Sequence, residues 1–384
     1  MKLLARGAGA GRDDCATEAG HRKYYNGERR IFMKRFLIIF TVLSSMPILV
    51  TLSFIAAGAQ TPSSPPAKVW ELSMSNHAPV KHPLHVRAWI PLAEELARES
   101  KGRLKPSLFP AAALAKADAA LDMCQKGAID IAMVFPMYTP SRFPLSDIMG
   151  LPFAVPSAEA GRRVVGELFG KNLLDQALHD RIMTWIGTTS PYQFFLKKKV
   201  MKYEDLKGLR LRTPGGLQTE ALKALGATPL TVPGAEFQTA FERGVIDGGV
   251  VDFGSGPGYK LQEYTKHVIV ANMGVAASAI TMNKAKYDSL PKDLQKVIDK
   301  AMQNWAIKQA KSYDDADKDS AEVFTKVGAS VYTLPPAERS RWMKATEPVY
   351  SQWLNDMKKK GLAGDKTYGE FKKLMKEYGV ELPL

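Results

Sequence analysis

The apolar positions along this chain switch between two periodicities, and the switches predict a mixed α/β fold. Compact apolar runs are typical of buried strands, whereas apolar residues three and four positions apart indicate one face of a helix. In the first half of the chain the pattern predicts strand 69–74, helix 83–100, strand 104–109, helix 111–126 and strand 129–135. Alternating strands and helices of this kind favour a parallel sheet covered by helices.

A second unit of the same kind lies between residues 205 and 253, where the pattern again predicts strand, helix, strand, helix and strand. The two units share a short motif, in which a helix-ending glycine is followed by an apolar residue, isoleucine, aspartate and an apolar strand. The motif occupies 126–131 and 243–248, at an interval of 117 residues. We therefore predict two similarly built α/β lobes, with a ligand cleft between them.

The remaining pattern is helical. Apolar residues at helical spacing predict a long helix over 291–324 and a helical region over 336–384. We expect these C-terminal helices to pack across both lobes. The predicted lobes comprise 68–190 with 278–318, and 191–277 with 319–384.

The front of the chain is typical of an export signal. Two basic residues, Lys34 and Arg35, precede an apolar run that extends to Ala57, and the Ala-Gly-Ala at 57–59 is a small-residue cleavage signature. We interpret 33–59 as a signal peptide and expect a periplasmic protein. The apolar run is close to the length of a membrane span, so an uncleaved anchor is the alternative. Residues 1–32 indicate either a start-site artefact or a disordered extension.

The net charge of +14 adds little to this picture. Nine Lys/Arg and four Asp/Glu fall within the first 59 residues, so the rest of the chain carries +9. Acidic residues are interleaved with the basic ones and export argues against nucleic acid, so we expect a weak bias toward anionic ligands only. Of the two cysteines, only Cys124 lies beyond the leader, on an apolar helix face that indicates core packing rather than chemistry.

The strongest candidate for ligand chemistry is Arg212. It stands at the carboxyl end of a predicted strand, where open α/β sheets hold ligands, and Pro-Gly-Gly at 214–216 follows it. A guanidinium there is a fixed fork for a carboxylate or a phosphate. The alternative is a structural ion pair between Arg212 and an acid such as Asp247.

Signals for an enzyme are weak. The chain has no nucleophile elbow, no phosphate-binding loop and no metal-spaced cysteines. Three histidines cluster at 77–85, but their spacing matches no defined metal site, so we expect no metal and no cofactor. His77, at the end of the first strand, is expected to face the cleft as a hydrogen-bond partner.

Three stretches, 205–214, 224–229 and 236–248, resemble motifs of the solute receptors of tripartite ATP-independent periplasmic (TRAP) transporters, the dicarboxylate-binding-protein family. Order, spacing and residue types all agree, and the similarity extends over nearly the whole chain beyond the leader. The resemblance implies a class II, two-lobe periplasmic binding protein fold that binds a small organic acid between its lobes and delivers it to membrane permease subunits. It also implies that Arg212 contacts the ligand carboxylate.

The chain departs from the family pattern in two places. Residues 190–193 read Ser-Pro-Tyr-Gln and lack the second arginine of some family members, and Val250 replaces a glutamate found after the last strand of many. Without that glutamate a metal-assisted site is in doubt, although Asp252 could compensate.

Further candidates follow from a subgroup with a YTPGRFPL motif, which 138–145 resembles. Arg142 is expected to form either a second anion contact or a loop salt bridge. Tyr138, Tyr192 and Phe253 would supply flat apolar walls with polar handles. Together they suggest a monocarboxylate with an apolar or aromatic body.

The prediction is therefore a non-enzymatic receptor, monomeric or weakly dimeric, with a small organic acid and TRAP permease subunits as partners. An exported sensor or accessory protein would have the same sequence features. An exported enzyme on the same fold would need a nucleophile–base pair or a metal in the cleft. A membrane-anchored interaction protein would retain residues 33–59.

Overall fold

Two separate sheets form the framework of the protein. The computed structural model describes residues 68–139, 141–175 and 182–384, so the predictions for 1–32 and 33–59 lie outside the described residues. The first sheet has the order β2-β1-β3-β10-β4 and consists of β1 (Trp70–Ser75), β2 (Leu104–Phe109), β3 (Ile131–Val134), β4 (Ile182–Thr188) and β10 (Ala277–Asn283). Strands β1, β2 and β3 are parallel, and β10 runs antiparallel to β3 and β4.

The second sheet has the order β11-β9-β5-β8-β6-β7. It consists of β5 (Tyr192–Leu196), β6 (Arg210–Thr213), β7 (Thr228–Thr231), β8 (Gly248–Asp252), β9 (His267–Val270) and β11 (Ser330–Thr333). Strand β6 lies between β7 and β8 and is parallel to both, whereas β5 is antiparallel to β8 and β9. The two sheets confirm the predicted two-lobe α/β architecture.

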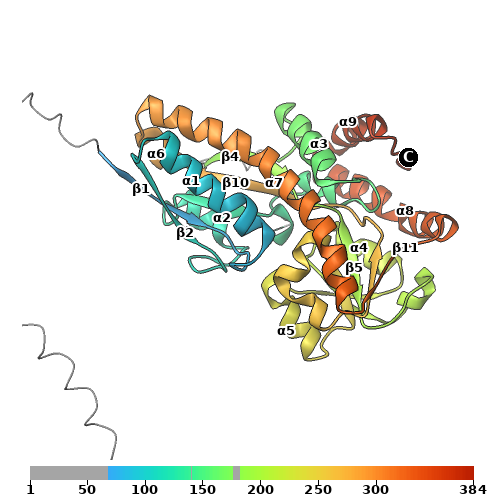
Figure 1. Ribbon diagram of the computed structural model, residues 1–384. Helices are drawn as coiled ribbons and strands as arrows, with labels where there is room; N and C mark the ends of the chain where they lie inside the picture. The colour runs from blue at the N-terminus through green and yellow to red at the C-terminus, as the bar shows by residue number, and fades with distance from the viewer. Residues whose placement is uncertain (1–67, 140, 176–181) are drawn as a thin grey trace, which may run out of the picture. The chain divides into compact units, whose positions relative to one another are not determined.

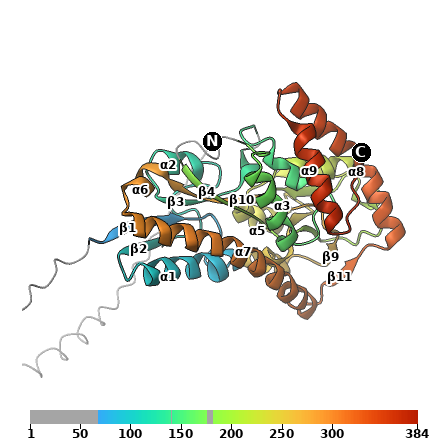
Figure 2. The same cartoon turned by 90° about the horizontal axis from the view of Figure 1, so that it is seen from above.

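Helices connect and cover the strands. They are α1 (Ile90–Glu99), α2 (Ala120–Gln125), α3 (Ala158–Gly170), α4 (Leu217–Ala224), α5 (Phe237–Glu242), α6 (Lys284–Ser289), α7 (Lys292–Lys326), α8 (Pro336–Lys359) and α9 (Gly364–Glu377). In Figures 1 and 2 the 35-residue α7 extends from the side of β1 and α6 to that of β11, so it passes along both lobes.

The lobes are joined where the chain crosses from one sheet to the other. Strand β4 passes directly into β5, and β9 passes into β10 through 271–276. The crossing segments pair with each other: the N–H of Tyr192 donates to the carbonyl of Gly274 at 2.9 Å, and the N–H of Met273 donates to the carbonyl of Tyr192 at 2.9 Å. These two crossings form a narrow connection, as is typical of a hinge, and a third crossing, from β10 to β11, passes through α6 and α7.

The C-terminal helices pack on both lobes, as expected. On α8, the Trp342 ring meets Phe194 of β5 edge-on at 5.3 Å, while Trp353 Nε1 donates to the carbonyl of Pro144 at 3.1 Å. On α9, Thr367 Oγ1 donates to the carbonyl of Leu173, just after α3, at 2.8 Å. The predicted bounds of the two lobes stay a prediction.

The repeated motif at 126–131 and 243–248, in which glycine, an apolar residue, isoleucine and aspartate follow one another, has a structural role in both lobes. The Asp130 carboxylate accepts the backbone N–H of Ser73 on β1 at 2.8 Å. The Asp247 carboxylate accepts the backbone N–H of Arg210 on β6 at 3.0 Å and also pairs with its guanidinium at 2.9 Å. In each lobe the aspartate therefore anchors a neighbouring strand, and Asp247 pairs with Arg210 rather than with Arg212.

Two helices differ from their predictions. The helix expected over 111–126 is confined to Ala120–Gln125, because the N–H groups of Ala111 and Ala112 donate to the carbonyls of Ala78 and Asn76 instead. The helix expected over 83–100 begins with a wide six-residue turn, Leu84–Trp89, before α1. Pro91 lacks the N–H that regular helix geometry requires there, and this favours the wider turn.

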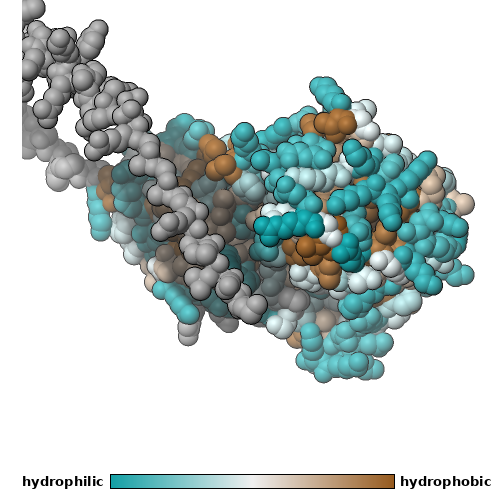
Figure 3. Space-filling view, turned by 90° about the horizontal axis from the view of Figure 1, so that it is seen from below, coloured by the Kyte–Doolittle hydropathy of each residue, from teal (hydrophilic) through white to brown (hydrophobic). Residues whose placement is uncertain are grey.

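The surface is polar. Figure 3 shows a face on which hydrophilic residues predominate and apolar residues form small patches. Buried among apolar neighbours, Cys124 is fully inaccessible and its thiol pKa is raised to about 11 by burial, in line with core packing. Within the described ranges, no helix is long and apolar enough to cross a membrane.

Strand β8 approaches β6 so closely that Gly249 has no room for a side chain. A Cβ atom there would lie 2.6 Å from Arg212 Cβ and 2.8 Å from Phe237 Cζ. We expect Gly249→Ala to lower the free energy of unfolding by about 1–3 kcal/mol, as overpacking does. Urea denaturation measures the change.

The matched control is Gly166→Ala on α3, where an added Cβ would meet nothing within 4 Å. This variant should be more stable than the wild type by about 0.5–1 kcal/mol, because alanine is the better helix former. Equal effects of the two substitutions would contradict the close approach at Gly249.

Candidate functional site

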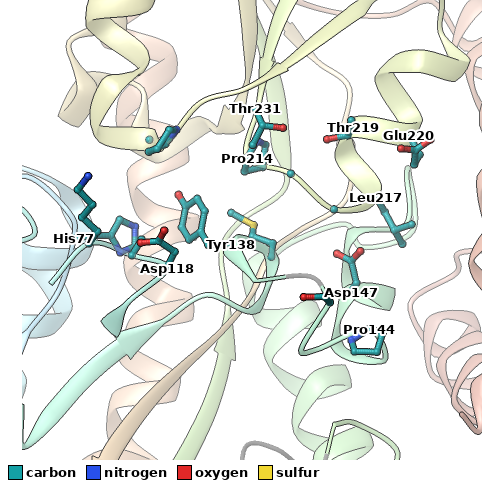
Figure 4. Close-up of a pocket in the computed structure, with 18 of the residues that line it drawn as sticks. His77, Asp118, Tyr138, Pro144, Asp147, Pro214, Leu217, Thr219, Glu220 and Thr231 are labelled. Atoms are coloured by element: carbon teal, nitrogen blue, oxygen red, sulfur yellow. The ribbon is translucent and has the colours of Figure 1, made fainter. Parts of the chain in front are cut away.

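Two neighbouring cavities lie between the lobes. The larger, the cleft, has a volume of about 880 Å³ and is lined by loops of both lobes and by α8. The smaller, the chamber, has about 20 Å³, which is room for one water molecule. The two cavities share His77, Met137 and Tyr138. Figure 4 shows His77 and Tyr138 together at one end of the cleft, with Asp147 and Leu217 toward the other.

The chamber is enclosed by side chains from both lobes and from α7. Its lining consists of His77, Ala78, His82, Leu84, Phe135, Met137, Tyr138, Thr189, Tyr192, Arg212, Val251, Asp252, Ser255, Tyr259 and Tyr313. Aromatic rings therefore dominate the lining of this small space, with one guanidinium among them.

Charge decides which cavity suits an anion. The residues that line the cleft include five carboxyl side chains and two lysines. Among the described residues that line the chamber, Arg212 is the only cation. The cleft lining is net acidic, whereas the chamber holds one guanidinium beside a single carboxyl, Asp252, so we assign the candidate anion site to the chamber despite its smaller volume.

Arg212 is held rigidly at the edge of the chamber. It is buried, with 1 % exposure, on β6 between β7 and β8. Its Nε donates to the carbonyl of Val232 at 2.8 Å and its Nη1 to the carbonyl of Val250 at 2.7 Å. Its guanidinium also lies 5.2 Å from the centre of the Phe237 ring. Within the described part of the chain Nη2 has no hydrogen-bond partner, which leaves this donor for a ligand.

Four other predicted residues meet Arg212 at the chamber: His77, Tyr138, Tyr192 and Asp252. Tyr138 is half-buried at the wall shared with the cleft, and its ring lies edge-on to His77 at 5.5 Å. The hydroxyl of the buried Tyr192 donates to Met137 Sδ at 3.6 Å. The Asp252 carboxylate accepts the N–H of Ser255 at 3.0 Å.

The structure places the two remaining candidates elsewhere. Arg142 donates to Asp122 at 2.5 Å and to Gln125 at 2.7 Å, which is the expected loop salt bridge, and it lines neither cavity. The Phe253 ring packs at about 6 Å from Phe195 and Phe324 in the core of the second lobe instead of forming a wall of the chamber.

Sequence reasoning missed His82, Ser255, Tyr259 and Tyr313, which also line the chamber. Of the histidines that cluster at 77–85, the sequence predicts only His77 to face the cleft. Ser255 and Tyr259 come from short turns after β8, and Tyr313 lies on a helix face with the pattern of ordinary core. Only the folded chain brings these segments together.

Burial sets the charge of the titratable groups. Desolvation lowers the pKa of His77 to about 4 and that of His82 to about 3, so both rings are neutral near pH 7. Desolvation raises the pKa of Asp252 to about 6, and the nearby Arg212 guanidinium acts in the opposite direction. No group of three or more metal-ligating side chains suitable for an ion occurs within the described ranges.

Near the start of α4, a carboxyl group of the first lobe approaches the second lobe. A Cβ atom on Gly216, which precedes α4 and has φ of +57°, would lie 2.5 Å from Asp147 Oδ1. The carboxyl of Asp147 therefore sits at the positive end of the helix only because this position is glycine. Burial raises the pKa of Asp147 to about 7, and the N–H of Leu217 partly offsets the rise.

Two α/β lobes joined by a hinge, with a cavity between them that is lined by one buried guanidinium, are the architecture of the periplasmic two-lobe class of ligand-binding proteins. The family model described as bacterial extracellular solute-binding protein, family 7, matches residues 74–356. The chain belongs to this family, and the resemblance to TRAP solute receptors is confirmed.

Individual relatives agree with this assignment. A solute-binding protein of Albidiferax ferrireducens is 28 % identical over 264 residues, which is 65 % of this chain and 75 % of the relative. A TRAP solute-binding protein of Rhodoferax ferrireducens, solved with copurified benzoate, is 25 % identical, with a TM-score of 0.77 over 81 % of this chain and 99 % of that one. A marine metagenome TRAP protein specific for aromatic acids, solved with 3-hydroxybenzoate, is 27 % identical, with a TM-score of 0.77 over 82 % and 100 %. These matches are binding proteins.

Asp317 of α7, behind the chamber, makes stability depend on pH. Its Oδ1 accepts Ser190 Oγ at 2.8 Å and the N–H of Gly254 at 2.6 Å, and burial raises its pKa to about 8. The folded protein thus keeps a proton on Asp317 that the unfolded chain has already released. The free energy of unfolding therefore falls as pH rises toward about 8. Between pH 6.5 and 8 we expect the wild-type free energy of unfolding to fall by about 1–2 kcal/mol. Asp147 contributes in the same direction, whereas the lowered pKa values of His77 and His82 oppose the fall near pH 6.5, where the unfolded chain still holds part of their protons.

Asp317→Asn keeps the Oδ1 acceptor and removes the titrating proton, so the fall should shrink to about half. Urea denaturation at pH 6.5, 7.2 and 8 tests this. The control is Asp319→Asn on the same helix, where the side chain is 61 % exposed. A wild-type slope that persists in Asp317→Asn would contradict the assignment.

Proposed function

We propose that this protein is the extracytoplasmic solute receptor of a TRAP transporter and that it binds a small organic monocarboxylate with an apolar or aromatic body. The observation that carries the proposal is the single buried guanidinium, Arg212, in a chamber whose other lining side chains are aromatic or neutral except for the carboxyl of Asp252. The ligand carboxylate accepts from Nη2, and the rings of Tyr138 and Tyr192 cover its apolar body. Structural relatives with benzoate and 3-hydroxybenzoate support this ligand class.

Binding requires that the lobes separate, because the chamber holds no more than a water. The hinge between the sheets permits this movement, and Met137 and Tyr138 form the wall that a ligand passes on its way from the cleft. Closure then excludes water from the ion pair, which strengthens it. The closed form is the one that membrane permease subunits would recognise.

The remaining parts of the proposal follow the family. The protein is exported through the segment 33–59, acts in the periplasm as a monomer or weak dimer, and catalyses no reaction. A sensor or accessory protein that binds the same ligand is the second candidate. Permease genes beside the gene for this chain favour the transporter receptor, and their absence favours the sensor.

Arg212→Lys tests the site, because lysine keeps the charge but loses the fork. Benzoate at a hundred times its dissociation constant should stabilise the wild type by about 2.7 kcal/mol. We expect at least a hundredfold weaker binding in Arg212→Lys, equivalent to about 2.7 kcal/mol. Thermal shift and titration calorimetry measure both.

The matched control is Arg210→Lys, two residues earlier on the same strand, where the exposed guanidinium pairs with Asp247. This variant should bind like the wild type. If benzoate, mandelate and succinate all fail to stabilise the wild type, the proposed ligand class is wrong. If Arg212→Lys binds as tightly as Arg210→Lys, the anion site lies elsewhere.

A further inference from the structure

Three buried polar atoms of residues that line the chamber have no hydrogen-bond partner among the described residues. They are His77 Nδ1, His82 Nε2 and Ser255 Oγ. The three residues are 9 %, 2 % and 0 % exposed. An unsatisfied buried polar group costs about 1–3 kcal/mol, so such groups are rare in folded proteins. Eight further buried polar atoms without a partner lie elsewhere among the described residues, but these three meet at one small cavity, where a water or a ligand oxygen would supply the missing partners.

The tautomer of His82 is fixed by the backbone. The N–H of Leu84 donates to His82 Nδ1 at 3.1 Å, so Nδ1 carries no proton. Because the imidazole is neutral, its one proton lies on Nε2. The ring is also held in place, edge-on to Tyr259 at 5.0 Å. His82 therefore presents a fixed, uncharged N–H donor to the chamber.

Ser255 supplies a hydroxyl from the other lobe. Its backbone N–H donates to Asp252 Oδ1 at 3.0 Å, and this bond fixes the turn after β8. The side-chain Oγ has no partner within hydrogen-bond geometry, although it lies near enough to Asp252 to offset part of the rise that burial causes in the pKa of that carboxyl, and it can either donate or accept. A fixed donor and an adaptable hydroxyl suit a neutral oxygen on a ligand.

A second carboxylate on the ligand would be poorly accommodated. Arg212 is the one cation among the described residues that line the chamber, and Asp252 already lies beside it. A second buried anion would lack a counter-charge, whereas a hydroxyl or carbonyl needs only hydrogen bonds.

We propose that His82 and Ser255 form a subsite for a neutral oxygen, and that the ligand is a monocarboxylate with a second, uncharged hydroxyl or carbonyl oxygen. Arg212 takes the carboxylate, His82 Nε2–H donates to the neutral oxygen, and Ser255 Oγ completes its hydrogen bonds. This inference rests on the proposed function and makes the ligand class narrower.

Two matched ligand pairs test the subsite: mandelate against phenylacetate, and 3-hydroxybenzoate against benzoate. Within each pair only a hydroxyl differs, on the carbon next to the carboxylate in the first pair and on the ring in the second. Calorimetry of the full exported chain should show about tenfold tighter binding of the hydroxylated member in at least one pair. Succinate should bind more weakly than that ligand.

In Ser255→Ala and His82→Phe the preference for the hydroxylated member of the pair should fall to about twofold or less. Ser255→Ala removes an atom without a partner, so the melting temperature of the ligand-free protein should not fall. His267→Gln, a histidine outside the chamber, is the control and should keep the preference.

The outcomes separate the two levels of the proposal. Equal affinities within both pairs in the wild type, or a preference that survives both variants, overturn the subsite. If the subsite is overturned but carboxylates bind the wild type and Arg212→Lys abolishes that binding, the proposed function still stands. If no carboxylate binds the wild type, the proposed function itself fails.

Discussion

The arrangement depends on one buried positive charge that has no carboxylate bonded to it. Removing a guanidinium from water is costly unless its donors are satisfied. Here two backbone carbonyls, of Val232 and Val250, bond to two of its three nitrogens and leave the third, Nη2, without a partner among the described residues. This geometry requires a strand on each side of β6 and the absence of a side chain at Gly249. The position of the anion site is therefore a property of the sheet.

The two cavities divide the work of binding. The cleft is wide and carries more acidic than basic side chains, so it gives access but little attraction for an anion. The chamber is tight and holds the only cation in its described lining, so it supplies affinity. Because they share Met137 and Tyr138, passage from one to the other depends on these side chains and on the hinge.

The sequence predicts what local periodicity and strand ends determine. The strand–helix repeats, the glycine-isoleucine-aspartate motif and the placement of Arg212 all follow from these patterns. Prediction from the sequence fails where contacts between distant segments determine the local structure. The backbone at 111–112 bonds to the loop after β1 and not to a helix, and Phe253 packs against α7. His82 and Ser255 lie 173 positions apart, and no periodicity relates them.

Neutral groups around a single cation have a consequence for specificity. With His77 and His82 uncharged, Arg212 and Asp252 are the main charges at the chamber, and they partly cancel. A carboxylate that binds there would give the chamber an excess of negative charge. A rise in the Asp252 pKa, with uptake of a proton, would remove this excess. A dianion would require a further counter-ion that the described lining lacks. The same burial that makes Arg212 a strong anion site therefore limits it to ligands with one negative charge.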